Sequence, residues 1–155
     1  MKILKPLACL LLPLSVSTTS LANEFSFGVG IGSLYSGLGV NVASRSATDL
    51  KYVSAGCMSY SSYGGATCGA GAGWIQADLL GFDNTNHGIG VYIGIVGDER
   101  ESYNDTKAVY GAGLSYHYFA KGIEQPGAHL GISLVAGDTN SGLDTKLLLE
   151  FGYQF

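Results

Sequence analysis

The sequence has little charge and no long apolar run. Only 13% of its 155 residues are charged, which is unusual for a water-soluble domain. The longest apolar stretch, near the N-terminus, spans about ten residues, whereas a membrane-spanning helix needs roughly 20. No segment repeats apolar residues with a period of 3.6 over three turns. These absences argue against helices as the main structure.

Basic residues are also scarce. Without Lys2 and Lys5, which belong to the N-terminal segment discussed next, six basic residues remain against twelve acidic ones, a net charge near −6. Nucleic-acid binding requires a clustered basic surface. The balance of charge therefore argues against a nucleic-acid partner.

The N-terminal residues predict a cleaved export signal. A basic start, MKILK, precedes an apolar segment and a small-residue end, STTSLA, in the three-part order of a secretory signal peptide. A signal peptide over residues 1–22 leaves residues 23–155 as one domain. Lipidation at Cys9 is the alternative, but Cys9 precedes the apolar segment instead of following it.

Only two cysteines remain after processing, Cys57 and Cys68. An even pair in an exported chain predicts one disulfide, because the periplasm is oxidising. The spacing matches no zinc pattern. We expect the disulfide to staple a loop, with a redox switch as the alternative.

Glycine and tyrosine are abundant, with 24 and ten copies. Between clusters of Gly, Asn, Asp and Ser, apolar residues alternate with small ones, and this period of two predicts β-strands. Five clear runs and three weaker ones predict eight strands, near residues 25–31, 38–43, 50–60, 68–80, 89–95, 110–118, 128–134 and 143–155.

The faces of these strands favour a membrane barrel over a soluble β-sandwich. A solvated face would carry charges, but the faces opposite the apolar residues hold mostly Gly, Ser and Ala. The apolar faces end in aromatic residues, as expected at a lipid headgroup region. In a narrow barrel, small residues fill the interior. We therefore predict an all-β fold: an eight-stranded antiparallel up-and-down transmembrane β-barrel over residues 23–155.

The C-terminal strand carries a resemblance to a known class. The chain ends LDTKLLLEFGYQF, with Phe151, Tyr153 and Phe155 on the apolar face. This end resembles the C-terminal signature of Gram-negative outer-membrane barrels, and the size is similar to the small class of OmpX and the OmpA membrane domain. The resemblance implies location in the outer membrane, contact with lipid and lipopolysaccharide, and an assembly signal in these three residues that the barrel-assembly machinery reads.

In that class both chain ends lie on the periplasmic side. This implies outward loops near Ser33–Gly37, Ser61–Thr67, Gly97–Lys107 and Gly137–Ser141. All four are short for the class, which makes an adhesin or a surface enzyme less favoured.

Hairpin geometry predicts one polar constellation. If the turn in FAKGIEQ centres on Ile123, His117 lies opposite His129, and a turn centred at 139–140 places His129 opposite Glu150. All three have inward parity and would form a row across the interior. Two histidines and a carboxylate can bind a divalent metal or support acid–base chemistry. We favour a structural filling of the interior, because buried polar groups need partners.

Two further side chains are placed by the same parity. His87 begins a strand near the row but has outward parity. Lys146 lies between Asp144 and Glu150 on one inner face, and we expect an interior ion pair there.

One segment invites an enzyme assignment. HYFAKGIEQPG resembles the His-Tyr-Ser-Asn segment of the outer-membrane lipid A deacylases, in which the serine two residues after the histidine is the nucleophile. Here Phe119 and Ala120 stand in place of that serine and asparagine. Phenylalanine cannot act as a nucleophile. We therefore assign no catalytic residue and no cofactor.

The expected function is a non-enzymatic outer-membrane protein with a filled, non-conducting interior and a role in envelope structure or surface interaction. The alternatives are an enzyme or metal-binding barrel that uses His117, His129 and Glu150, and a narrow channel for small solutes. A soluble periplasmic lipid carrier is a more distant alternative.

Overall fold

The computed structural model describes residues 24–62, 65–81, 84–102 and 105–155. They form eight strands and two short 3-10 helices: β1 Glu24–Ile31, η1 Ser33–Tyr35, β2 Leu38–Arg45, β3 Asp49–Ser61, β4 Gly65–Gln76, η2 Asp78–Leu80, β5 His87–Ser102, β6 Asp105–Phe119, β7 Gly127–Thr139 and β8 Gly142–Gln154. No helix in these residues is long and apolar enough to cross a bilayer. The predicted signal peptide, residues 1–22, lies outside the described residues.

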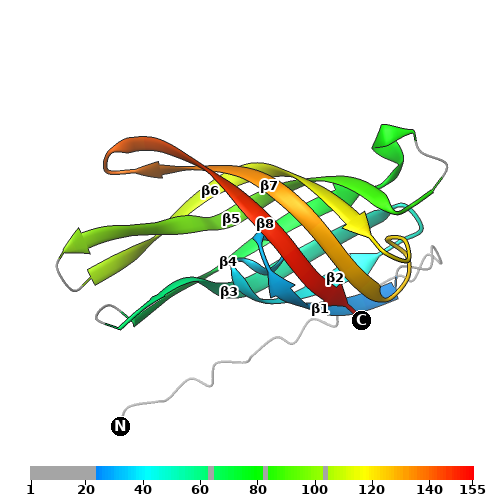
Figure 1. The fold of residues 1–155 in the computed structure, drawn as a ribbon, viewed down its shortest axis with the longest axis horizontal. Helices are drawn as coiled ribbons and strands as arrows, with labels where there is room; N and C mark the ends of the chain where they lie inside the picture. The colour runs from blue at the N-terminus through cyan, green and yellow to red at the C-terminus, as the bar shows by residue number, and fades with distance from the viewer. Residues whose placement is uncertain (1–23, 63–64, 82–83, 103–104) are drawn as a thin grey trace, which may run out of the picture.

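The sheet is a closed barrel. Each strand pairs antiparallel with the next one along the chain, and β8 pairs back with β1 (Figure 1). The predicted eight-stranded antiparallel up-and-down barrel is confirmed. Its closing seam is short, with four residue pairs between β1 and β8, against thirteen between β7 and β8.

The two faces of the wall differ as the alternation predicted. On β8, Leu147, Leu149 and Phe151 are exposed on the outside, while Glu150 and Gln154 point inward and are buried. The same order holds on β6 and β7. The exterior is therefore apolar, and the interior collects most of the buried polar side chains.

The two ends of the barrel are unequal. At one end lie both described termini and the turns after β2, β4 and β6; at the other end the β3–β4, β5–β6 and β7–β8 hairpins project well past β1 and β2 (Figure 1). The prediction of a loop over Gly97–Lys107 was wrong, because β5 continues to Ser102 and β6 begins at Asp105. Cross-strand pairing of Glu99 with Lys107, which carry opposite charges, supports the extension. Likewise, β7 runs to Thr139, into the predicted loop Gly137–Ser141.

One predicted outward residue is buried. Ile95 continues the alternation of β5 and pairs with the exposed Tyr110, but it has no exposed surface itself. The register between β5 and β6 shifts just beyond it, between Ile95 and Gly97. A bulge adds a residue to one strand and so reverses the parity beyond it, and Gly97 accordingly pairs with the buried Val109.

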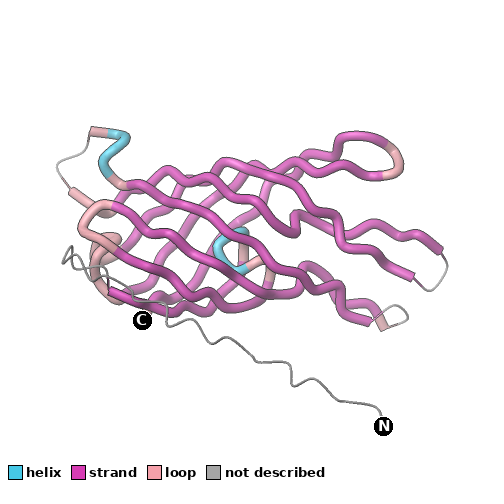
Figure 2. The backbone as a smooth tube through the Cα atoms, turned by 180° about the vertical axis from the view of Figure 1, so that it is seen from behind, coloured by secondary structure: helices cyan, strands magenta, loops and turns pink. Residues whose placement is uncertain are grey.

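The segment between β1 and β2 is the largest departure from expectation. Residues 33–37 were expected as an outward loop. Instead η1 turns back into the barrel, where Ser33, Leu34, Tyr35 and Ser36 are buried, and it lies between the walls near mid-height (Figure 2). We call residues 33–36 the plug. A loop containing the adjacent apolar residues Leu34 and Tyr35 gains more from burial than from exposure to water.

Candidate functional site

The plug is held at its base by a narrow neck of two glycines. Gly32 and Gly37 donate backbone hydrogen bonds to each other's carbonyl oxygens, at 3.0 and 2.9 Å. Both have φ above +100°, a region that residues with a Cβ rarely adopt. The chain thus leaves β1, makes one 3-10 turn inside the barrel and returns into β2.

Tyr35 fills the space beside the closing seam. Its ring lies over Gly30 of β1 and Gly152 of β8, where any Cβ would overlap it. Tyr52 and Tyr92 lie in the same way over Gly73 and Gly71 of the neighbouring strand. Small residues in the wall therefore make room for large aromatic side chains in the interior.

Hydrogen bonds join the plug to the wall on several sides. Ser36 Oγ lies 2.7 Å from Ser54 Oγ on β3 and 3.1 Å from Tyr92 Oη on β5. Asn41 of β2 donates to the Leu34 carbonyl at 3.2 Å. Because these partners come from different strands, the plug braces the barrel instead of resting on one wall.

The predicted histidine–glutamate constellation lies directly beside the plug. His117, His129 and Glu150 are all buried, and one ligand atom from each lies within 4.8 Å of the others. The predicted register was wrong by two residues in both hairpins. His117 pairs with Gly131, which pairs in turn with Glu150, and His129 pairs with Phe119 and Gly152.

The shift of two preserves parity, so the three side chains still converge. Gly131 separates His117 from Glu150 in the row, and a Cβ there would lie 2.9 Å from His117 Nδ1 and 3.3 Å from Glu150 Cβ. With glycine at this place, His117 Nδ1 approaches Glu150 Oε2 to 3.5 Å. The missing side chain at 131 thus lets residues on β6 and β8 meet across β7.

Each member of the cluster has a hydroxyl partner. The Glu150 carboxylate accepts hydrogen bonds from Ser33 of the plug, at 2.6 Å, and from Ser133 of β7. Ser115 Oγ lies 2.9 Å from His117 Nε2, and Tyr35 Oη lies 3.4 Å from His129 Nδ1. These four contacts fix the orientation of all three side chains, and two of the contacting hydroxyls come from η1.

The order Ser115–His117–Glu150 has the connectivity of a hydrolase triad, but the surroundings do not suit a nucleophile. Ser115 Oγ is buried against Gly90 of β5, where a Cβ would lie 2.6 Å from it. Phe119, which stands where the deacylase serine would be, is a buried interior residue with its ring 5.9 Å from that of His117. The arrangement can orient His117 but leaves little room for a substrate at Ser115.

A second polar group closes the end of the barrel near the termini. Gln154 Nε2 donates to Ser26 Oγ and to Asn41 Oδ1, both at 2.9 Å. Arg45 donates to the Phe155 carbonyl at 3.2 Å. These contacts join β1, β2 and the end of β8 below the plug.

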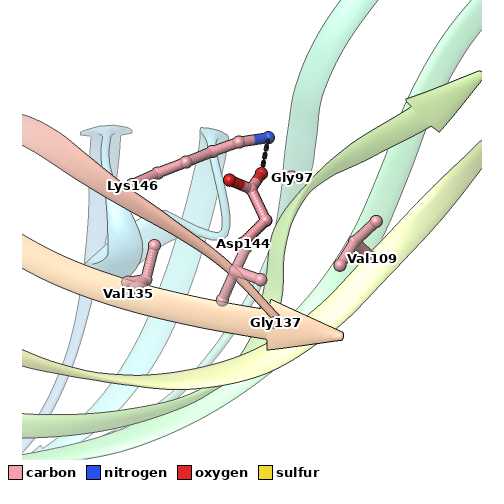
Figure 3. A pocket seen from close by; sticks show the side chains of 7 residues that line it. Gly97, Val109, Val135, Gly137, Asp144 and Lys146 are labelled. Carbon is pink, nitrogen blue, oxygen red and sulfur yellow. Dashed lines mark ion pairs between the residues drawn. The ribbon is translucent and has the colours of Figure 1, made fainter. Parts of the chain in front are cut away.

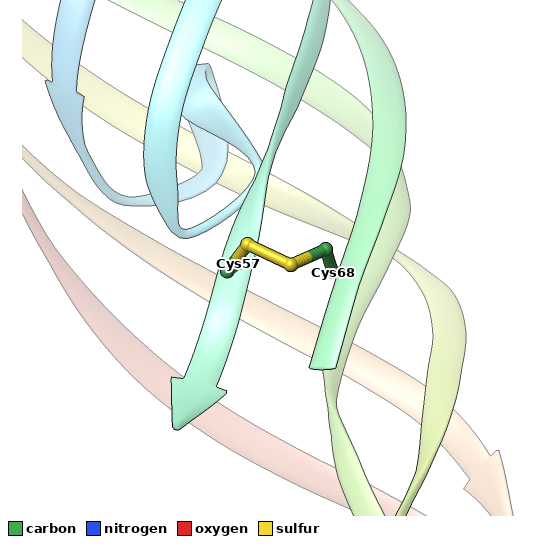
Figure 4. The surroundings of a disulfide bond; sticks show 2 residues. All are labelled: Cys57 and Cys68. Carbon is green, nitrogen blue, oxygen red and sulfur yellow. A yellow bond between two sulfur atoms is a disulfide. The ribbon is translucent and has the colours of Figure 1, made fainter. Parts of the chain in front are cut away.

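The predicted disulfide between Cys57 and Cys68 is confirmed. The two residues face each other on β3 and β4, just before the bulge in that hairpin (Figure 4). The bond therefore staples the base of the projecting β3–β4 hairpin.

Lys146 and Asp144 form an ion pair of 3.3 Å, but not in the deep interior. Both side chains are nearly half exposed and line a small cavity of about 10 Å³ with Val109 and Val135, toward the projecting hairpins (Figure 3). Lys146 pairs with Asp144 and leaves Glu150 to its serine partners.

Aromatic side chains gather on the outside near the termini. Phe155 stacks on Phe27 with ring centroids 4.6 Å apart, and Tyr153 lies 4.8 Å from Phe155. His87 lies on the outer surface, as its parity predicted, with Nδ1 2.6 Å from Tyr116 Oη. The predicted assembly residues Phe151, Tyr153 and Phe155 are thus side by side and exposed.

Sequence reasoning missed the serines and the tyrosine that surround the cluster. Ser115 and Ser133 have inward parity next to the two predicted histidine strands, so the alternation itself contained that signal. Ser33 and Tyr35 lie in a segment expected to face outward, and only its two adjacent apolar residues hinted at burial.

Comparison with protein-family models, with curated proteins and with solved structures gives no match for this chain.

Proposed function

We propose that this chain is an integral protein of the bacterial outer membrane, with a sealed interior and a role in envelope structure or surface interaction. The observation that carries the proposal is the inversion of the wall: large apolar side chains face out while polar ones are buried within. Leu149 is 71% exposed and Glu150, the next residue, 2%. A continuous apolar exterior of this kind suits lipid and would be a liability in water.

The dimensions support a bilayer-spanning role. A transmembrane strand needs about 9–11 tilted residues, and β7 and β8 each have 13. The outer aromatic residues near the termini, among them Phe27, Tyr153 and Phe155, have the positions of an aromatic girdle at a membrane interface. With the termini on the periplasmic side, the three projecting hairpins would extend beyond the outer leaflet.

The plug supports a non-conducting interior. Leu34 and Tyr35 have no exposed surface, and the Tyr52 and Tyr92 side chains fill space on the other side of the lumen. A barrel of eight strands is only wide enough for side chains to fill. We therefore expect a bracing or interaction role for the barrel, and the enclosure of Ser115 against Gly90 makes hydrolysis the less favoured alternative.

The exposed aromatic residues at the end of β8 support recognition by the barrel-assembly machinery. Phe151, Tyr153 and Phe155 form one outward row on a strand that closes the seam by only four pairs. A strand that is available until closure is well placed to be bound during insertion. Lipid and lipopolysaccharide are the partners that the apolar exterior fits.

Fractionation with a heat-modifiability gel tests the proposal. The chain should remain in the outer-membrane fraction and should migrate faster unboiled than boiled, because a closed barrel resists unfolding by detergent. A purified mature protein that is monomeric in water without any amphiphile would refute the proposal. Planar bilayers containing the folded protein should carry no steady current, and lipid A from producing cells should keep its mass profile.

A further inference from the structure

We infer that His117, His129 and Glu150 form a binding site for one divalent transition-metal ion, with Zn²⁺ as its simplest probe. Two imidazole nitrogens and one carboxylate oxygen are a ligand set found in zinc sites and in other sites for first-row metals. The inference goes beyond the proposed envelope role and is independent of it, since the site lies wholly inside the barrel.

The first observation is that each histidine has one ring nitrogen in contact with a hydroxyl group and one that makes no hydrogen bond. Ser115 Oγ contacts Nε2 of His117, and Tyr35 Oη contacts Nδ1 of His129. The other nitrogens, Nδ1 of His117 and Nε2 of His129, are buried and accept or donate no hydrogen bond within the described residues. Metal-binding histidines show this pattern, in which an outer partner holds the ring and the second nitrogen is left for the ion.

The second observation concerns the Glu150 carboxylate. Oε1 receives the Ser33 and Ser133 hydroxyls, while Oε2 faces His117 and has only a long contact of 3.4 Å with the Leu34 backbone N–H. Oε2 lies 3.5 Å from His117 Nδ1, and one ligand atom of each of the three residues lies within 4.8 Å of the others, so the three residues are close enough to share an ion. A carboxylate oriented by hydroxyl groups is also the usual state of a metal-ligating carboxylate.

The third observation is charge. Glu150 is buried, and no lysine or arginine of the described residues forms an ion pair with it. Two cations that the structure describes have other partners: Lys146 pairs with Asp144, and Arg45 donates to the Phe155 carbonyl. A buried carboxylate without a cation is costly, and a divalent ion between two neutral imidazoles and the carboxylate would remove that cost.

The space for an ion comes from Gly131. The three ligand atoms lie within 4.8 Å of one another, whereas bonds of 2.0–2.2 Å to one tetrahedral ion would bring them to about 3.3 Å. Side-chain movements of about an ångström would bring the three ligand atoms to this separation. A side chain at residue 131 would lie between His117 Nδ1 and Glu150 and would prevent the closure.

The ion would act as a staple. Its ligands come from β6, β7 and β8, while the groups that orient them include Ser33 and Tyr35 of the plug. Metal binding would therefore fasten three wall strands and the plug to one point. Because an ion that binds only the folded state stabilises it in proportion to RT ln(1 + [L]/Kd), the effect is measurable without an activity assay.

The test uses the full mature chain refolded in detergent with or without Zn²⁺, followed by removal of free ion with a chelator. Wild type refolded with Zn²⁺ should retain one ion per chain by elemental analysis. Free Zn²⁺ at 100 times Kd should lower its unfolding equilibrium constant about 100-fold. Co²⁺ bound in the same way should show visible d–d absorption.

Three variants and a matched control separate this site from adventitious binding. Glu150→Gln, His117→Gln and His129→Gln should each lose the retained ion and the stabilisation, while His87→Gln should keep both, because His87 lies on the outer surface. The heat-modifiability gel identifies the variants that fold, and only those are compared. Should one fail to fold, the wild-type stoichiometry and Co²⁺ spectrum decide alone.

Two results would overturn the inference. One is folded wild type that retains no ion and shows the same unfolding midpoint with and without Zn²⁺, in which case His117 and Glu150 form a simple ion pair. The other is metal retention that is equal in wild type and in folded Glu150→Gln, which would place the ion elsewhere.

Discussion

Truncation of Tyr35 is the sharpest test of the plug. The side chain is 0% exposed and rests on Gly30 and Gly152, which have no side chains that can move into a void. Removing a large buried aromatic side chain typically costs 3–5 kcal/mol, through lost burial and the cavity that remains. We therefore expect Tyr35→Ala to lower the free energy of unfolding by about 3–5 kcal/mol.

Tyr35→Phe separates packing from hydrogen bonding. The ring keeps its place, and the variant loses only the contact of the hydroxyl with His129 Nδ1, at 3.4 Å. Loss of one buried hydrogen bond costs about 1 kcal/mol, so this variant should retain most of the stability. The two losses should differ about threefold or more, because packing contributes most of the energy.

Urea unfolding in phospholipid vesicles measures both losses, with the fluorescence of Trp74, the one tryptophan, as the signal. Tyr60→Ala is the matched control, because Tyr60 is 81% exposed near the tip of the β3–β4 hairpin and should cost under about 0.5 kcal/mol. A Tyr35→Ala loss below about 1 kcal/mol, or equal to that of Tyr60→Ala, would refute an inserted plug.

Three further changes probe the exterior, the seat of the plug and the disulfide. Leu149→Arg should destabilise the protein in vesicles by about 2–4 kcal/mol, because it places a charge on the lipid face near mid-height. Gly152→Ala should cost about 1–3 kcal/mol by the same urea assay, because its methyl group overlaps the Tyr35 ring. Reduction of Cys57–Cys68 should shift the band on a nonreducing gel and cost at most about 3 kcal/mol, with heat modifiability retained.

Each of these has a control in the chain. Leu143→Arg lies on the same face of β8 but at its outer end, so it should cost about 0–1 kcal/mol, and equal effects of the two arginines would contradict a membrane position. Gly127→Ala meets only ordinary contacts, the nearest at 3.5 Å, and should be tolerated. Loss of the fast-migrating band on reduction would mean that the disulfide holds the whole barrel and not one hairpin.

Parity was the part of the fold that the sequence could predict. A period of two assigns each side chain to a face without any knowledge of turns, so the inward positions of His117, His129 and Glu150 followed directly. The pairing register of neighbouring strands also depends on where each turn is centred, and the sequence did not show this. The predicted register was therefore wrong by two residues in the β6–β7 and β7–β8 hairpins. An even error keeps the faces, which is why the three side chains still meet.

Bulges and inward loops could not be predicted in the same way. The reversal of faces beyond Ile95 depends on an extra residue in β5, and nothing in the local alternation marks it. The plug depends on a tertiary fit: Tyr35 enters because glycines on β1 and β8, 122 residues apart in Gly30 and Gly152, leave a seat for it. A local pattern cannot contain that information.

Several interior hydrogen bonds can form only when β8, the C-terminal strand, pairs with β1 along the four-pair seam. Ser33 lies two residues after the end of β1, and its acceptor Glu150 lies on β8, so this hydrogen bond joins residues 117 positions apart in the sequence. The hydrogen bond from Gln154 of β8 to Ser26 of β1 joins residues 128 positions apart. A chain whose C-terminal strand has not yet paired would therefore lack the contacts of the plug with Glu150, while the bonds of the plug to β2, β3 and β5 would remain. If the interior is sealed as we propose, the last contacts of the plug form only when the barrel closes, and an intermediate without β8 should leak ions that the complete protein excludes.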